Sequence, residues 1–298
     1  MMMPTKKELL GAFHHVMEQR GLSRATQRTY ARWVSSFLAH LGPVPPEKVR
    51  IEAVQRYLAF ERKRGLSRAS RRLAISALRL FLREVAGVSI PTPDALGFHK
   101  NKVDREISLS PHQVDALLAR MRGGHALVAR LILRCGVRVS ECCRLRIGDV
   151  NAVKGILMVR GMGPVSTRTL EVPRDLMRPV REQKERVQCV WIHDWQDAWA
   201  DSEGPGMPAT AWLFPAKTRR WSRSGPKRKE DRHHLNPSSV HLALRMAMDA
   251  AGVKRRRPCS ALRATFAARS LARGASEREV ALAMGLSRTD SISLTNPG

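Results

Sequence analysis

Tyrosine, acidic side chains and long apolar runs are all scarce in this chain of 298 residues. Tyrosine occurs only as Tyr30 and Tyr57, so no phenolic nucleophile can come from any later position. No apolar run approaches the roughly 18–20 residues that would span a bilayer. Residues 1–8 also lack the apolar stretch and cleavage site of a secretory signal. We therefore expect a cytoplasmic protein without a membrane partner.

Patterns for metal ligation and disulfide pairing are also missing. The five cysteines (Cys135, Cys142, Cys143, Cys189 and Cys259) form no Cys-x-x-Cys motif and no regular disulfide spacing. The ten histidines fall in no zinc-binding spacing. We expect the cysteines to be small buried hydrophobic residues in a reducing compartment, and we expect no metal and no cofactor.

Positive charge is the dominant property of the composition. Lysine and arginine number 53 against 26 acidic residues, which gives a formal net charge of +27. Residues 1–99 carry +10 of this charge and the remaining residues carry +17, so both halves are basic. Such an excess favours an anionic polymer as partner, with nucleic acid ahead of an anionic membrane surface. Two basic modules in series suggest a clamp.

Residues 1–87 are predicted to form a helical domain, followed by a linker over 88–107 and a second domain over 108–298. Apolar residues at three- and four-residue spacing predict the first helices at residues 5–20, 23–41, 47–64 and 67–86. The phrase at residues 21–26 recurs at 65–70, which is either coincidence or a pair of helix N-termini placed on phosphates. Residues 88–107 are rich in proline, glycine and charge, without a sustained period.

The second domain is predicted to be helical with one β-hairpin. Period-two alternation over residues 155–173 predicts the hairpin. The predicted helices lie at about 111–121, 125–135, 174–200, 238–251, 260–273 and 276–284, with Ser140 capping another. Trp191, Trp195 and Trp199 form a stripe on the long helix, which we interpret as packing rather than base stacking. The expected fold class is thus mainly α with a small β-hairpin or sheet: a helical domain followed by an α+β domain.

Two basic segments interrupt the second domain, at residues 216–234 and 254–257. The first is either a solvated loop or a phosphate-binding segment, and we favour phosphate because so many unopposed cations are costly to gather. Across both domains, the side chains predicted to bind DNA are Arg24, Arg28, Arg68, Arg71, Arg72, Arg219, Arg220, Lys227, Arg228, Arg232, His233, His234, Lys254, Arg255 and Arg256.

Two stretches resemble the signature boxes of the tyrosine recombinases, the phage-type integrases. Residues 131–150 contain the Gly-x-Arg-x-Ser-Glu core of the first box, and residues 260–285 resemble the second. The resemblance implies a helical, SAM-like core-binding domain and a recombinase-like catalytic domain. Segments 23–33, 212–215, 232–235 and 250–253 look most like the integron integrases. The insert by which that branch holds extruded bases of folded single strands is largely absent, because residues 204–208 run almost directly into Trp212.

The resemblance assigns phosphate-binding roles to Arg138 and Arg263. In the family, two arginines at these positions neutralise the nonbridging oxygens of the transition state, and a planar guanidinium suits phosphate geometry. Glu141 matches the acidic neighbour that orients the first arginine.

The remaining family positions hold residues unsuited to the chemistry. The hairpin lysine is replaced by Met162, and the histidine three residues before the second arginine is Ser260. The histidine or tryptophan of the third box is Leu286, and Thr295 stands where the nucleophilic tyrosine belongs. Ala264 follows the second arginine. The site is therefore predicted to be degenerate, since nucleophile, acid and base are lost together.

The sequence indicates a catalytically inactive DNA-binding member of this family. Its expected partners are double-stranded DNA, structured single-stranded recombination sites and an active recombinase, in a nucleoid-associated location. The family's terminal helix is expected to be missing because of C-terminal truncation or a frameshift near residue 286, so oligomers are expected on DNA only, if at all. The alternatives are an active recombinase with a non-standard nucleophile or one completed by a partner, and a decaying gene product.

Overall fold

The structure is a computed structural model that divides into two compact units, Met1–Val103 and Asp104–Gly298. Residues 195 and 196 are described by their backbone alone. The described residues are 4–98, 108–151, 153–161, 167–196, 207–217, 232–255 and 257–286. The predicted residues Met162, Thr295, Arg219, Arg220, Lys227, Arg228 and Arg256 lie outside them, as does Trp199.

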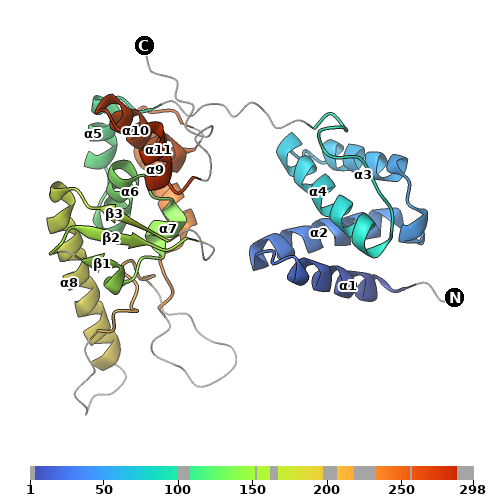
Figure 1. The fold of residues 1–298 in the computed structure, drawn as a ribbon, viewed down its shortest axis with the longest axis horizontal. Coiled ribbons are helices and arrows are strands. Elements are labelled where there is room, and N and C mark those ends of the chain that lie inside the picture. Colours follow the sequence, from blue (N-terminus) through green and yellow to red (C-terminus); the bar gives the residue numbers. More distant parts are fainter. Residues whose placement is uncertain are drawn as a thin grey trace. The chain divides into compact units, whose positions relative to one another are not determined.

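The first unit is a bundle of helices, as the apolar spacing predicts (Figure 1). Its elements are α1 (Lys6–Gln19), α2 (Arg24–Leu41), η1 (Pro46–Lys48), α3 (Ile51–Lys63) and α4 (Arg68–Val85). The side chains of Ser23 and Ser67 cap α2 and α4 by accepting a backbone N–H three residues later. The repeated phrase of the sequence therefore encodes two equivalent helix starts.

Four aromatic side chains form the centre of this bundle. Phe13 meets Phe81 edge to face with ring centroids 5.5 Å apart, and Phe37 meets Tyr57 at 5.4 Å. All four are fully buried, and each contributes about 1.5–3 kcal/mol through burial. Tyr57 is thus a core residue, which removes one of the two tyrosines from any surface chemistry.

Residues 88–98 pack on the first unit, although the sequence places them in the linker. Ile90 is buried in the helical core, and Leu96 and Phe98 pack against it. The backbone carbonyl of Ile90 also accepts a hydrogen bond from Arg79 Nε at 3.3 Å. Apolar side chains spaced without a regular period explain why no ordered segment was expected here.

The second unit surrounds a buried helix, α6 (Gly123–Cys135), which contacts the helices on each side of it. Leu131 and Ile132 on this helix are among the largest fully buried residues of the chain. Its other helices are α5 (Pro111–Ala119), α7 (Val139–Cys143), η2 (Ile147–Asp149), α8 (Arg174–Gln196), α9 (Pro237–Ala250), α10 (Pro258–Ala272) and α11 (Glu277–Ala283). The predicted cap at Ser140 is wrong: α7 begins at Val139 with Arg138 as its N-cap, so Ser140 is the second residue of the helix.

The predicted hairpin is present and is extended by a further short strand. Strand β2 (Ile156–Val159) pairs antiparallel with β3 (Arg168–Glu171), and Val159 faces Arg168 across the pair. Strand β1 (Val150–Asn151) adds to the other edge of β2, which gives the order β1-β2-β3. The fold is mainly helical with one small antiparallel sheet, as expected.

Burial of the cysteines follows the expectation at four positions. Cys135, Cys142, Cys143 and Cys259 are buried, whereas the prediction is wrong for Cys189, which is exposed on α8. Burial raises the pKa of Cys135, Cys143 and Cys259 to about 12, so these thiols stay protonated at neutral pH. Within the described residues, no helix is long and apolar enough to cross a membrane.

Candidate functional site

Arg138 stands at the N-terminus of α7, where Glu141 fixes both its backbone and its side chain. The Arg138 backbone N–H donates to Glu141 Oε2 at 2.6 Å, and Arg138 Nη1 donates to Oε1 at 3.1 Å. The Glu141 side chain is only 4% exposed, whereas that of Arg138 is 40% exposed. A nearly buried carboxylate thus holds a guanidinium that is partly open to solvent.

The C-terminal end of α11 lies against this arginine. Gly285 has a φ of +62°, and the N–H of Leu286 donates to the carbonyl of Ala281 at 2.9 Å. The N–H of Gly285 donates to the carbonyl of Leu282 at 3.0 Å. These two bonds form a Schellman motif, which satisfies the carbonyls of residues 281 and 282 and leaves those of residues 283–285 to be satisfied by other donors.

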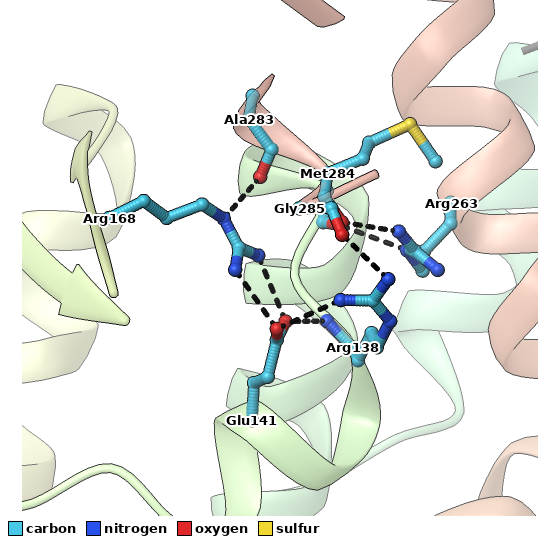
Figure 2. Close-up of polar contacts among 8 residues, drawn as sticks. Arg138, Glu141, Arg168, Arg263, Ala283, Met284 and Gly285 are labelled. Carbon is cyan, nitrogen blue, oxygen red and sulfur yellow. Dashed lines mark hydrogen bonds and ion pairs between the residues drawn. The ribbon is translucent and has the colours of Figure 1, made fainter. Parts of the chain in front are cut away.

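Three arginine side chains supply those donors, one for each consecutive carbonyl (Figure 2). Arg168 Nε donates to the Ala283 carbonyl at 2.8 Å, Arg263 Nη2 donates to that of Met284 at 2.8 Å, and Arg138 Nη2 donates to that of Gly285 at 2.7 Å. The arginines come from β3, α10 and the start of α7. The end of α11 therefore gathers three cations from three parts of the sequence.

Arg168 is the member of this group that the sequence did not predict. Its guanidinium donates from Nη1 and Nη2 to the two oxygens of Glu141, both at 2.9 Å. Its side chain is 13% exposed, and the burial alternation of β3 places it on the inward-facing side of the strand. An arginine at an inward strand position requires a buried partner, and that was the signal available in the sequence.

The two kinds of charge in the site shift each other's pKa. Burial alone would raise the pKa of Glu141, but hydrogen bonds from Arg168 and Arg138 outweigh it and lower the pKa below its ordinary value. Burial lowers the pKa of Arg263 to about 10, and the charge of Arg138 adds to this effect. Arg263 remains a cation at neutral pH, and Glu141 remains an anion.

Two glycines allow the arginines to approach the backbone. Gly136 has a φ of +68°, and its carbonyl accepts from Arg263 Nε at 2.9 Å. A Cβ atom at Gly136 would lie 2.5 Å from the ring of Phe266, and one at Gly285 would lie 2.7 Å from Arg168 Nη1. Both positions therefore need glycine for its backbone conformation and for the space it leaves.

The described positions that depart from the family pattern carry no acid or base. Leu286 packs with Phe266 and Leu271 against the small cluster of Ala267, Val280, Ala281 and Met284. Ser260 lies partly buried in the first turn of α10, three residues before Arg263. The side chain of Leu286 is an element of packing and cannot donate a hydrogen bond to a phosphate oxygen.

Three of the predicted DNA ligands on α4 contact the protein itself. Arg72 donates from Nη1 and Nη2 to the two carboxylate oxygens of Asp94, at 2.7 and 3.0 Å, and it also donates to the Phe98 carbonyl. Arg68 Nη2 donates to the carbonyl of Gly97 at 2.5 Å, and the Arg71 guanidinium lies 5.4 Å from the centre of the Phe98 ring. These side chains anchor residues 94–98, a role that the sequence did not predict.

Arg232 is likewise held by the protein. Its guanidinium pairs with both carboxylate oxygens of Asp194 on α8 and donates to the carbonyls of Ala216 and Lys217. Asp194 is nearly buried, so this pair fixes the segment in place. Arg232 therefore has a structural role beside any contact with DNA.

Beside Arg232, a cluster of aromatic and basic side chains surrounds Trp212. The Arg146 guanidinium lies 3.0 Å from the centre of the Trp212 ring, and His234 meets the indole edge to face at 5.1 Å. The His233 ring is tilted by 49° against that of His234, with centroids 4.1 Å apart. Burial lowers the pKa of His234, with the charges of Arg144 and Arg146 adding to the effect, so this imidazole is neutral at pH 7. His233 is exposed.

The other described DNA candidates lie on the surface. Arg24 and Arg28 are exposed on the first turns of α2, and the described part of the chain gives neither side chain an ion pair. Lys254 is exposed before α10, and Arg255 is half-buried with its Nη1 on the Lys254 carbonyl at 3.0 Å. Among the residues with described positions, no three His, Cys, Asp or Glu side chains form a group that could hold a metal.

Family models match both units of the chain. Residues 108–294 match the phage integrase family, and residues 9–92 match the N-terminal SAM-like domain of phage integrases. An integrase/recombinase of Escherichia coli is 29% identical over 273 residues, which cover 87% of this chain and 80% of the relative. The tyrosine recombinase XerA of Pyrococcus furiosus is 29% identical over 186 residues, 61% of this chain and 62% of XerA. The chain belongs to the phage integrase family.

Solved structures of integrases share this fold at low sequence identity. A lambda integrase dimer bound to a COC′ core site has a TM-score of 0.65 and 16% identity, over 96% of this chain and 77% of that one. The Tn1549 transposon integrase in complex with transposon right end DNA has a TM-score of 0.66 and 14% identity, over 95% and 93%. These matches establish the architecture of both units.

Proposed function

We propose that this protein binds duplex DNA as a member of the integrase family and does not cleave it. The observation that carries the proposal is the pairing of Arg138 and Arg263 beside Leu286. The guanidinium groups of Arg138 and Arg263 are both fixed at the end of α11, where they can bind a phosphate. Leu286 occupies the family position of a histidine or tryptophan, and its apolar side chain packs in a hydrophobic cluster.

The arginine pair has the chemistry of a phosphodiester site. Each guanidinium presents five N–H donors in a plane, and the described contacts engage two nitrogens of each side chain. The remaining donors can reach the nonbridging oxygens of a phosphate, with charge-assisted hydrogen bonds on each. The half-exposed position of Arg138 and the fixed position of Glu141 favour binding without a rearrangement of the site.

The missing groups support an inactive site. The family resemblance places a lysine, a histidine, a histidine or tryptophan and a tyrosine at Met162, Ser260, Leu286 and Thr295 respectively. Neither tyrosine of the chain lies in the second unit, and Tyr57 is buried in the core of the first. A hydroxyl group without a base is a weak nucleophile, and loss of acid–base help alone costs about 10²–10⁴ in rate.

Further DNA contacts are proposed at the exposed arginines of α2 and around Trp212. Arg24, Arg28 and Arg32 form an exposed stripe on a helix that contains no acidic residue. His233 and Lys254 are exposed on the second unit and are proposed as further contacts. Lambda integrase has been crystallised as a dimer on a core site and as a tetramer on a Holliday junction. We propose that any oligomer of this chain forms on DNA.

We further propose that the chain is most similar to the integron integrases. We also propose that it is cytoplasmic and associated with the nucleoid, and that it acts together with an active recombinase. An inactive copy that retains phosphate-binding arginines can occupy recombination sites and exclude or assist an active enzyme. The net charge of +27 supports residence on nucleic acid. Folded single strands with unpaired bases are a second substrate to compare with duplex.

Binding to duplex DNA at a series of salt concentrations tests the proposal. We expect the logarithm of the binding constant to fall linearly with the logarithm of salt, at about −0.9 for each phosphate neutralised. Arg138→Ala should make this slope shallower by about 0.9. Arg178→Ala should leave it unchanged, because that side chain pairs with Glu182 on α8 and has no part in the proposed site. A wild-type protein that binds no duplex at low salt would overturn the proposal.

A further inference from the structure

Arg168 occupies the centre of the phosphate-binding region without being placed to bind phosphate itself. All three of its guanidinium nitrogens are already used: Nη1 and Nη2 donate to Glu141, and Nε donates to the carbonyl of Ala283. Its side chain is 13% exposed, against 40% for Arg138. Arg168 is therefore enclosed by its protein partners, whereas Arg138 is open to solvent.

The contacts of Arg168 determine where the Glu141 carboxylate can lie. A two-point bond between a planar guanidinium and a carboxylate fixes the orientation of both groups, which a single contact does not. The same two carboxylate oxygens accept from the backbone and the Nη1 of Arg138. Arg168 on β3 therefore fixes the rotamer of Glu141, and Glu141 in turn fixes the side chain of Arg138.

Arg168 also fixes the last turn of α11, which is the second support of Arg138. Its bond to the Ala283 carbonyl lies two residues before the Gly285 carbonyl that accepts from Arg138 Nη2. Both anchors of the Arg138 guanidinium, the carboxylate and the helix end, therefore depend on one side chain of the hairpin (Figure 2). Arg263 shares only the second of these anchors, through Met284.

We propose that Arg168 is a positioning residue that directs the Arg138 guanidinium toward the DNA phosphate by bridging Glu141 and the end of α11. The inference rests on the proposed function, since it needs Arg138 to contact phosphate. It assigns a role in DNA recognition to the β2–β3 hairpin through a residue that contacts no DNA. An Arg138 side chain that is already held in its binding position before DNA arrives loses less conformational entropy on binding.

A double-mutant cycle on duplex binding tests this role. Arg168→Gln is introduced into the wild type and into Arg138→Ala, and the dissociation constant is measured at one low salt concentration. We expect Arg168→Gln to weaken the wild type about ten-fold and to change Arg138→Ala by less than two-fold. Arg178→Gln removes one exposed positive charge from the same unit and is expected to change neither background.

The variant Arg168→Lys distinguishes the orienting contact with Glu141 from the positive charge of Arg168. Arg168→Lys keeps the positive charge, but one ammonium group cannot make the planar two-point contact with Glu141 while reaching Ala283. We expect it to weaken the wild type by about three- to ten-fold, and it serves as the test if Arg168→Gln does not fold. Thermal melting of each variant shows whether the chain is folded at the assay temperature.

Equal losses in both backgrounds would overturn the inference, because they would mean that Arg168 acts independently of Arg138, by direct contact or through general stability. Full affinity in Arg168→Lys would overturn it as well, because charge alone would then suffice. Failure of the wild type to bind duplex is a different result, since it removes the proposed function and with it the role of Arg168. Binding by the wild type that Arg138→Ala does not weaken would remove the phosphate contact on which the inference rests.

Discussion

Glu141→Ala is expected to lower the free energy of unfolding of the second unit by about 3 kcal/mol, because it removes the buried carboxylate that Arg138 and Arg168 share as an ion-pair partner. The Glu141 carboxylate accepts from Arg138 and from both terminal nitrogens of Arg168, and it is 4% exposed. Without it, the described residues leave the guanidinium groups of Arg138 and Arg168 without an ion-pair partner, next to the charge of Arg263. Urea denaturation followed by tryptophan fluorescence measures the loss, since five of the six tryptophans lie in the second unit.

Glu141→Gln separates the charge of this residue from its shape. The pKa of Glu141 is lowered in the folded state, so its carboxylate stabilises the fold above the ordinary value of about 4.5. This contribution is lost as the pH falls through the lowered pKa. The difference in stability between wild type and Glu141→Gln should therefore be constant near neutral pH and shrink below about pH 4.5.

A loss below 1 kcal/mol in Glu141→Ala would show that the cluster is not held by this carboxylate.

The double variant Arg138→Ala with Arg263→Ala is expected to weaken duplex binding by at least a hundred-fold. Charge-assisted hydrogen bonds contribute about 1.5–3 kcal/mol each, and every 1.4 kcal/mol is a factor of ten in affinity. The salt dependence should become shallower by about 1.8 if each arginine neutralises one phosphate. Fluorescence anisotropy with a labelled duplex at several salt concentrations gives both quantities in one series.

The matched control removes two exposed arginines of α8, Arg178 and Arg181. It lowers the net charge by the same amount without touching the end of α11, and we expect less than a three-fold change in affinity. Equal losses in the two double variants would mean that the total charge of the protein, and not the paired site, determines binding.

The sequence was sufficient to place most of the helices and to single out Arg138 and Arg263, which the structure brings together at the end of α11. Apolar periodicity and serine caps are local signals, so α2 and α4 could be placed without knowledge of the fold. Arg138 was predictable because the residues around it form a recognisable motif. Its contact with the carbonyl of Gly285 was not, since 147 residues separate the two and only the packing of α11 brings them together.

The roles of several arginines could not be predicted because their partners are distant in sequence. Arg168 meets Glu141 across 27 residues, and that contact depends on the register of β2 and β3. Arg232 looked like part of a free basic segment, yet Asp194 lies 38 residues before it on α8. The pairing of Arg72, a predicted DNA ligand, with Asp94 could not be foreseen, because it depends on residues 88–98 packing on the helical bundle. The sequence shows that an arginine is positively charged. What that arginine does depends on which acidic side chains the fold places next to it.

The most direct measurement of the central claim uses a duplex that carries a nick close to the scissile phosphate, so that any covalent intermediate is trapped. The purified wild-type chain is incubated with this substrate at a concentration that saturates binding, then separated on a denaturing gel beside an active tyrosine recombinase on its own site. We predict that the chain binds all of the duplex and leaves no adduct resistant to denaturant. A covalent protein–DNA band, abolished by Thr295→Ala, would contradict the account.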